Sequence, residues 1–515
     1  MRLDKATKAA VFGDLLPRPQ QVTPQTADLA LSAEMRIRVV APAGQEATFA
    51  GQRLSDLLQE ETGLRLSVVA ETGAGYALRL GEAEAPEASA LGEEGYALRV
   101  DGAGAAVRAN SARGLLWGAM TLRQLAARGP EGPTLAGADI RDWPHYRWRG
   151  LMVDAGRSPN SLAQIKRIVR VCSAFKLNAL IYREGDDELN SVRYRTNKLG
   201  SLNPCALSVA QVRELVAYAR QHGIAIVPEI ESLGHSTAKG FHYPHLVSGG
   251  FEQPYTGLAP HIRKSHLNPH DPRSYELLAS IYDEWFPILP SPLVHLGLDE
   301  VRLGQEEQAA HLARLLPLVD EVAARHGVSV TPIVWADAPP TPAAYASRVV
   351  RCLWSYAERT VSVEDEHLLR QGMVELGLAG CPQPVLMAGG SNALHTPYTR
   401  SPYEKVLENL ADWARWGADK PNVLGLIAVQ WSGNMLDDWL PDFLAAADDG
   451  WRPPEEGPVY EGQMARVRRH LGRLTDAARP RPEEVDHHAW DGIWLRDGAW
   501  YEDIMSGMRR VQTEA

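Results

Sequence analysis

The chain has 515 residues, of which 45% are hydrophobic and 23% are charged, a composition typical of a globular enzyme with two or three domains. Its formal net charge of −11 argues against a nucleic-acid partner, and no apolar run is long enough to cross a bilayer. The four cysteines form no C-x-x-C pair, which indicates neither a zinc site nor a redox motif. Because residues 1–5 are not followed by the apolar core of a signal peptide, we expect a cytoplasmic protein.

Residues 1–140 predict a small α/β domain. Alternating apolar residues predict strands, helical spacing predicts two helices, and the Asp-Gly-Ala-Gly sequence at 101–104 predicts a hairpin. The strands are expected at residues 35–40, 64–70, 76–80, 96–100 and 106–109, and the helices at 46–62 and 111–127. No glycine-rich phosphate loop follows any of these strands, which counts against a nucleotide site. The Gly- and Pro-rich residues 129–133 mark the end of the domain.

Residues 141–450 have a different rhythm, in which apolar runs of strand length alternate with amphipathic helices. Eight such runs occur, at residues 150–155, 177–182, 224–231, 293–300, 332–337, 349–356, 385–389 and 425–431. Eight alternating units predict a (β/α)8 TIM barrel of the α/β class. Residues 451–515 are expected to form a C-terminal helical extension, with a helix at 461–477. Its later aromatic residues would pack it onto the barrel, and they are Trp490, Trp494, Trp500 and Tyr501.

The most informative stretch is residues 292–300, an apolar run that ends in Asp299 and Glu300. In a parallel barrel the carboxyl ends of the strands line the active site, so this strand delivers two acids to it. Successive strand residues point to opposite sides, but a turn at the strand end can bring both side chains into one pocket. The alternative is that Asp299 only caps the following helix.

Acids and aromatic rings also occur at the ends of most other predicted strands. Indole rings pack against the apolar faces of a pyranose, while carboxylates and Arg bind its hydroxyls. The pattern therefore predicts a carbohydrate site. Beyond Asp299 and Glu300, the candidate substrate-binding residues are Arg157, His235, Trp335, Asp337, Trp354, Tyr356, Trp431 and Asn434, and Glu231 and His295 are expected to lie behind them.

These residues resemble glycoside hydrolase family 20, the β-N-acetylhexosaminidases, over most of the chain. The sequence Val-Pro-Glu-Ile-Glu at 227–231 with Gly-His at 234–235 resembles the family's strand-three signature, which usually has Asp in place of Glu231. Residues 295–300 match its H-x-G-x-D-E signature, with Leu298 where Gly is common. Asp-Trp-Pro at 142–144 and residues 149–154 with Arg157 match its entry into the barrel, while residues 335–337 and 354–356 look closest to a bacterial, often intracellular branch.

The resemblance implies a retaining exo-β-N-acetylhexosaminidase in which the substrate's own acetamido group is the nucleophile. In this scheme Glu300 protonates the leaving oxygen, and Asp299 orients the acetamido group and stabilises the positive intermediate. Arg157 holds sugar hydroxyls, and His235 with Glu231 steers Glu300. The three tryptophans Trp335, Trp354 and Trp431 would wall the acetamido pocket. For each of them plain core packing is the alternative, as a turn position is for His235.

The chain departs from the family at two strand ends. After strand two, many members carry His-x-x-Asp-Asp, whereas this chain has Glu184, Asp186 and Asp187 in the sequence Tyr-Arg-Glu-Gly-Asp-Asp. Either one of these acids enters the site or the loop is a solvated acidic segment. After strand eight, the family's Trp-x-Glu is replaced by Trp-Ser-Gly-Asn, so Asn434 or Asp437 would bind the outer hydroxyls. The alternative there is a Gly-Asn turn into the last helix.

Two other classes of function compete with this one: a barrel glycosidase with a protein nucleophile acting on a different β-glycoside, and a non-catalytic sugar-binding barrel. We expect no cofactor and no metal. The nearest thing to a metal site, Asp-His-His at 486–488, lacks further spaced ligands and reads as a polar surface turn. The expected partner is a carbohydrate, with no nucleic acid, no membrane and a homodimer as a possible assembly.

Overall fold

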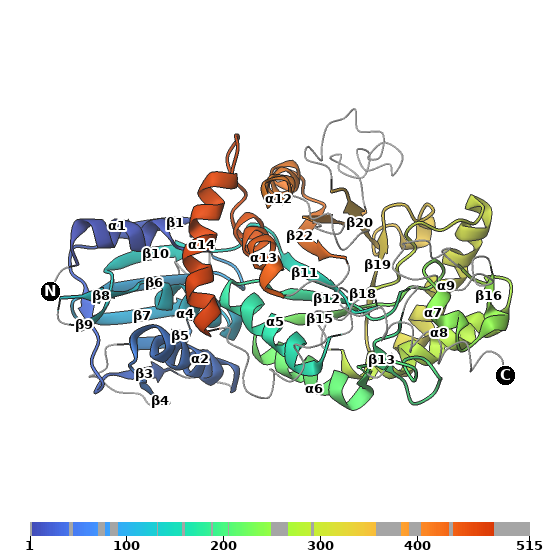
Figure 1. The fold of residues 1–515 in the computed structure, drawn as a ribbon, viewed down its shortest axis with the longest axis horizontal. Coiled ribbons are helices and arrows are strands. Elements are labelled where there is room, and N and C mark those ends of the chain that lie inside the picture. The colour runs from blue at the N-terminus through green and yellow to red at the C-terminus, as the bar shows by residue number, and fades with distance from the viewer. Residues whose placement is uncertain are drawn as a thin grey trace, which may run out of the picture. The chain divides into compact units, whose positions relative to one another are not determined.

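The computed structural model divides the chain into two compact units that are not continuous in sequence (Figure 1). The first contains Met1–Arg147, Val171–Leu177 and Ala447–Arg479, and the second has Trp148–Arg170 and Asn178–Ala446 as its described parts. The structure describes residues 3–40, 45–70, 78–82, 91–130, 132–156, 160–186, 189–203, 205–248, 266–289, 293–356, 383–390, 403–431 and 436–477. No helix within these ranges is long and apolar enough to cross a membrane.

The first unit is built on a seven-stranded mixed sheet in the order β1-β10-β6-β7-β5-β3-β4, with a second sheet of order β2-β9-β8. The strands are β1 (Gln21–Pro24), β2 (Leu29–Ala30), β3 (Arg36–Val39), β4 (Ser67–Val69), β5 (Leu78–Glu82), β6 (Tyr96–Asp101), β7 (Gly104–Ala109), β8 (Ala126–Gly129), β9 (Gly132–Leu135) and β10 (Ala138–Asp142). The helices are α1 (Lys5–Gly13), α2 (Gln45–Thr62) and α4 (Ala112–Gln124). The predicted small α/β domain is thus confirmed, including its hairpin, β6 with β7.

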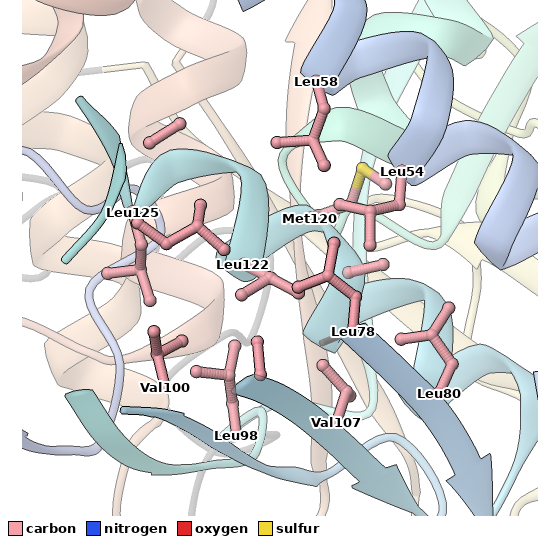
Figure 2. Close-up of a cluster of buried hydrophobic side chains, with 14 of the residues drawn as sticks. Leu54, Leu58, Leu78, Leu80, Leu98, Val100, Val107, Met120, Leu122 and Leu125 are labelled. Carbon is pink, nitrogen blue, oxygen red and sulfur yellow. The ribbon is translucent and has the colours of Figure 1, made fainter. Parts of the chain in front are cut away.

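Apolar side chains from α2, α4 and the sheet form the core of this unit. Figure 2 shows Leu54 and Leu58 of α2 and Met120 and Leu122 of α4 gathered with residues of β5, β6 and β7. The helix α4 comes close to the sheet at Gly118, where a Cβ atom would lie 2.2 Å from Val107 Cγ1. A larger residue there would push the helix off the strands.

The late helix α14 (Tyr460–Ala477) belongs to this first unit, together with the end of α13 (Leu436–Trp451). Trp451 is buried in the same core, and its indole N–H donates to Asp142 at 2.7 Å. The sequence predicted domain boundaries at residues 140 and 450, with residues 451–515 as an extension that packs on the barrel. The aromatic residues on which that packing was predicted, from Trp490 onward, lie outside the described residues, as does Asp-His-His at 486–488.

The second unit is a closed barrel of eight parallel strands in the order β11-β12-β15-β18-β19-β20-β21-β22, as predicted. The strands are β11 (Trp148–Asp154), β12 (Ala179–Arg183), β15 (Ala225–Glu229), β18 (Leu293–His295), β19 (Thr331–Trp335), β20 (Val350–Trp354), β21 (Val385–Gly389) and β22 (Val423–Gln430). The strands contribute inward-facing apolar residues such as Met152, Ile181, Val227 and Ile333 to one core cluster. The barrel interior is therefore packed, and its chemistry is confined to the strand ends.

Helices separate most of these strands (Figure 1). They are α5 (Leu162–Ala174), α6 (Val209–Gln221), α7 (Thr237–Gly240), α8 (Pro272–Trp285), α9 (Gln305–Arg325), α12 (Tyr403–Gly417) and α13, with 3-10 turns at Pro244–Leu246, Phe286–Ile288 and Ala343–Tyr345. Short strand pairs, β13 (Val192–Arg193) with β14 (Leu207–Ser208) and β16 (Val247–Ser248) with β17 (His266–Leu267), decorate the loops. Parallel strands require such crossovers, and they leave all eight carboxyl ends on one face of the barrel.

Candidate active site

The loop after β18 adopts an unusual backbone that separates the two predicted acids. Leu298 and Glu300 have positive φ angles of 77° and 50°, and Gly297 has 69°. Left-handed backbone costs on the order of 1 kcal/mol for each non-glycine residue, so surrounding contacts must hold it. The turn buries Asp299, whose side chain is 10% exposed, and leaves the side chain of Glu300 43% exposed. Both carboxylates nevertheless approach the same histidine.

His235, in the loop after β15, lies between these two carboxylates. Its Nε2 lies 3.4 Å from Asp299 Oδ2 and 3.5 Å from Glu300 Oε2, and its Nδ1 lies 3.1 Å from Asp186 Oδ1. The ring thus presents Nδ1 to Asp186 and Nε2 to the two acids. The predicted steering of Glu300 by His235 has this geometry, and Asp186 is the group that orients the ring.

Arg183 lies at the centre of a buried carboxylate cluster and was not foreseen from the sequence. Its side chain is fully buried at the end of β12. The guanidinium nitrogens lie 2.7 Å from Asp186, 2.6 Å from Glu229, 2.7 Å from Glu231 and 3.7 Å from Asp299. A single permanent cation thus holds carboxylates from three strand ends together.

The charge of Arg183 sorts the protonation of these acids. Burial acts to raise the pKa of Asp299, but Arg183 and His235 outweigh it and hold the pKa well below its usual range. Burial and then the negative charge of Asp299 raise the pKa of Glu231 well above its usual range. Burial raises the pKa of Glu229 to about 7, against the opposing effect of Arg183. Of Asp299, Glu229 and Glu231, it is therefore Asp299 that keeps its negative charge most firmly.

Glu231 and His295 support the loop that carries Asp299 and Glu300. Glu231 Oε2 accepts a hydrogen bond from the Leu298 amide at 3.3 Å. A Cβ atom at Gly297 would lie 2.1 Å from that same oxygen, so only glycine fits there. His295 Nδ1 accepts from the Gly297 amide at 3.1 Å, and burial lowers the pKa of His295 to about 3, which keeps the ring neutral.

Asp337 connects the loop to the next two strands. Its Oδ2 accepts a hydrogen bond from the Glu300 amide at 2.7 Å, and its Oδ1 accepts from Trp354 Nε1 at 3.1 Å. Burial, followed by the negative charge of Asp299, raises the pKa of Asp337 to about 7. Asp337 was predicted to contact the substrate, but in the structure its carboxylate accepts hydrogen bonds from the Glu300 backbone and the Trp354 indole.

The predicted aromatic wall is present but its members differ in exposure. Trp335 is 1% exposed, and its indole N–H donates to Glu229 at 2.7 Å. Trp354, Tyr356 and Trp431 are half-buried. The indole of Trp431 donates to the Tyr356 hydroxyl at 2.8 Å and its ring lies 5.0 Å from the Arg183 guanidinium. The partly exposed rings are the ones placed to meet a ligand, and Trp335 packs behind them.

The acids after β12 have separate surroundings. Asp186 joins the His235 cluster, whereas Glu184 accepts a hydrogen bond from the Tyr194 hydroxyl, which in turn accepts from Trp285 Nε1 at 2.8 Å. Burial raises the pKa of Glu184 to about 7. Of the three candidates left open by the sequence, Asp186 enters the site and Glu184 belongs to a neighbouring buried network. Asp187, Arg157 and Asn434 lie outside the described residues, as does the side chain of Asp437.

The sequence contains one signal that would have identified Arg183. It is a charged residue in the last position of a strand whose other members are apolar, next to Glu229 and Asp154 in the barrel pairing. Glu229, also missed, occupies the corresponding last position of β15. His235, Asp299 and Glu300 form the one His and carboxylate group among the described residues with ligand atoms within 4.8 Å of one another. Those atoms could hold a cation, but they are also the groups that a proton transfer to a sugar requires.

Comparison with known proteins connects this site to a family. The model of the glycosyl hydrolase family 20 catalytic domain matches residues 146–319, and that of glycosyl hydrolase family 20, domain 2, matches residues 13–143. A β-N-acetylhexosaminidase of Cellulomonas fimi is 26% identical over 467 residues, covering 84% of this chain and 88% of that protein. A β-hexosaminidase of Akkermansia muciniphila is 32% identical over 233 residues, and this match spans 46% of its length.

Solved structures share the fold. The β-hexosaminidase of Streptomyces plicatus in complex with Thio-NAglucal superposes with a TM-score of 0.73 at 24% identity, over 91% of this chain and 95% of that one. The two family models together match more than half of the chain, in the order unit one then barrel. The chain therefore belongs to glycosyl hydrolase family 20 and is a glycoside hydrolase.

Proposed function

We propose that the protein is a retaining exo-β-N-acetylhexosaminidase, which removes terminal β-linked N-acetylglucosamine or N-acetylgalactosamine by substrate-assisted catalysis. The observation that carries the proposal is the unequal environment of Asp299 and Glu300. One acid is buried and held as an anion beside Arg183 and His235, and the other has a side chain that is partly exposed. Two acids in two environments are what distinct catalytic roles require.

The first step follows from these positions. Glu300 donates its proton to the glycosidic oxygen while the bond from that oxygen to the anomeric carbon breaks. Asp299 accepts a hydrogen bond from the substrate's acetamido N–H, which turns the carbonyl oxygen toward the anomeric carbon. That oxygen forms the new bond and produces a cyclic oxazolinium ion. The negative charge of Asp299 stabilises the positive charge that develops.

The second step reverses the roles. Glu300, now a carboxylate, takes a proton from a water molecule as that water attacks the anomeric carbon and opens the ring. The acetamido group is regenerated, and two inversions give net retention. Asp299 needs its charge throughout, which explains a site built to keep it ionised. The clustering of Arg183 and His235 around Asp299 supports this role.

A thiazoline inhibitor, which mimics the cyclised intermediate, tests this mechanism. The wild-type protein should bind the thiazoline far more tightly than it binds a sugar lactam that has a 2-hydroxyl group and no fused ring. Only a substrate-assisted site is shaped for the fused ring. N-acetyl substrates should be cleaved well and N-propionyl substrates poorly, since the indole rings of the pocket would limit the length of the acyl group. Equal inhibition by the two inhibitors, with equal rates on the two acyl groups, would count against the mechanism.

We also propose that the protein works in the cytoplasm on short N-acetylated glycans. Cys172 and Cys352 are buried free thiols and Cys205 is a partly buried one, which fits a reducing compartment. Cell fractionation of the producing organism tests this, and recovery of the activity in the medium or periplasm would contradict it. A homodimer stays a prediction that sedimentation can measure.

A further inference from the structure

Glu300 needs an external support to act as a proton donor, and the structure contains one. Its backbone has a φ of 50°, and its side chain is 43% exposed at the tip of a loop. A long side chain on such a loop is placed mainly through its backbone. The misplacement of a catalytic group by about 1 Å can cost about 10²-fold in rate. Whatever fixes the Glu300 backbone therefore affects proton transfer.

The side chain of Asp337 makes that contact. The amide N–H of Glu300 donates to Asp337 Oδ2 at 2.7 Å, a short bond to a carboxylate. The other oxygen, Oδ1, accepts from Trp354 Nε1 at 3.1 Å. Asp337 follows β19, Glu300 follows β18, and Trp354 ends β20. The carboxylate thus joins three successive strand ends by two hydrogen bonds that need two acceptor oxygens.

We propose that Asp337 is a positioning residue, which fixes the backbone of the general acid Glu300 and couples it to the indole of Trp354. This inference rests on the proposed function and adds a residue that acts through Glu300. The sequence predicted a substrate contact for Asp337, but both oxygens of its carboxylate are already engaged by protein donors. A side chain held in this way orients the acid in the absence of substrate.

The chemistry of the carboxylate explains why Asp is required. An Asn at this position has one acceptor oxygen, and its NH2 group would face either the Glu300 amide or the Trp354 indole as donor against donor. Asp337→Asn therefore breaks one of the two bonds while it keeps the side-chain volume. The variant should slow the cleavage step, in which Glu300 donates its proton, and should leave steps without proton donation nearly unchanged.

The test measures kcat/KM on aryl N-acetyl-β-glucosaminides whose leaving groups range from 2,4-dinitrophenol, which needs little protonation, to phenol, which needs much. Asp337→Asn in the full-length protein should lose on the order of 10- to 100-fold on the phenyl substrate and much less on the dinitrophenyl one. A loss of equal size across the series would overturn the proposal. A rise in KM with unchanged kcat would also overturn it, since that is the signature of a substrate contact.

Glu184→Gln is the matched control. Glu184 is also a buried acid at a strand end with a raised pKa, but its hydrogen bond goes to Tyr194 and not to the acid loop. Any loss it causes should be the same for all leaving groups. The quantity compared is the slope of log kcat/KM against the pKa of the leaving group. A change of this slope in Glu184→Gln as large as in Asp337→Asn would overturn the inference, because the slope would then report general damage.

A second variant decides the matter if Asp337→Asn does not fold. Trp354→Phe keeps an aromatic ring but removes the N–H that holds Asp337 Oδ1, and it should steepen the dependence on leaving group in the same direction. An unchanged slope in this variant would overturn the coupling. Failure of the proposed function is seen separately, in the wild-type protein, as cleavage that does not depend on the 2-acetamido group.

Discussion

The guanidinium of Arg183 lies 3.7 Å from the carboxylate of Asp299, and both groups are buried among other acids at the strand ends. Arg183 is also paired with Asp186, Glu229 and Glu231. Arg183 holds the pKa of Asp299 well below its usual range, and the negative charge kept there suits a positively charged intermediate. The arrangement is costly to disturb, because removing one partner leaves buried charges without compensation.

Arg183→Met tests this role through both stability and pH dependence. Loss of the cation should lower the free energy of unfolding by about 3–5 kcal/mol, measured by urea denaturation. Arg183 lowers the pKa of Asp299, so without it that pKa rises and the acid limb of kcat/KM moves to higher pH. Arg183→Lys, which keeps the charge, should show a smaller shift. An unmoved acid limb in active Arg183→Met would contradict the assignment.

Asp299→Asn removes the charge that stabilises the cyclic intermediate. We expect kcat on an N-acetyl substrate to fall on the order of 10²–10³-fold, by analogy with removing one preorganised electrostatic partner. Asn keeps the volume of the side chain, so the midpoint of thermal unfolding should change little. Turnover near that of the wild type would exclude a substrate-assisted reaction.

Glu300→Gln removes the donated proton. Turnover on phenyl and disaccharide substrates should fall far more than turnover on nitrophenyl substrates, since nitrophenolates leave with little protonation. The measurement is kcat at saturating substrate for each leaving group. Comparable losses for good and poor leaving groups would argue that Glu300 is not the acid.

No metal is expected to take part, although His235, Asp299 and Glu300 come close enough to bind one. Extended dialysis against a chelator should leave kcat/KM unchanged, because a carboxylic acid and the substrate's own acetamido group supply all the required chemistry. The control is a parallel dialysis without the chelator. Loss of activity that zinc restores would contradict this expectation.

Asp449, in the first unit, should make stability depend on pH. Burial and then the adjacent charge of Asp448 raise the pKa of Asp449 to about 8. The folded protein therefore holds this proton at pH values where the unfolded chain, with a pKa near 3.8, has lost it. The free energy of unfolding contributed by this group falls as the pH rises from about 4 to about 8.

Asp449→Asn keeps the neutral form at every pH. It should raise the midpoint of thermal unfolding most at pH 8 to 9 and less at pH 5, because the stability that the wild type loses through this group grows between about pH 4 and about pH 8. Gln463 Nε2, which donates to Asp449 Oδ1 at 2.6 Å, can keep its bond to the Asn oxygen. A lower midpoint at both pH values would show that Asp449 is needed as an anion.

The eight barrel strands were predictable because strands of a parallel sheet are buried on both faces and read as continuous apolar runs. Strand β18 is the instructive case: it spans Leu293–His295, while the prediction ran to residue 300. From Gly297 onward, positive φ angles at Gly297, Leu298 and Glu300 turn the chain out of the strand direction, and only the expectation of a turn at its tip anticipated this. The edge strand β1 and its neighbour β10 were missed, since Val22 pairs with Ile140 across a long stretch of chain.

Some residues of the site were predictable from the sequence and others were not. Asp299, Glu300 and His235 lie in short sequence motifs, and the structure brings them together. Arg183 belongs to no motif, and its importance arises from carboxylates contributed by two other strand ends, those of β15 and β18. The burial of Trp335 behind the half-buried Trp354 and Trp431 likewise depends on side-chain packing that strand-end position alone does not give.

The most direct test of the account is a comparison of aryl β-glycosides that differ only at carbon 2. We expect the nitrophenyl N-acetylglucosaminide and N-acetylgalactosaminide to be cleaved well, and the matching glucoside and galactoside hardly at all. A 2-hydroxyl group has no carbonyl oxygen that Asp299 could help to direct onto the anomeric carbon. Comparable kcat/KM on the glucoside and the N-acetylglucosaminide would show that the acetamido group is not used, and a protein nucleophile would have to be sought instead.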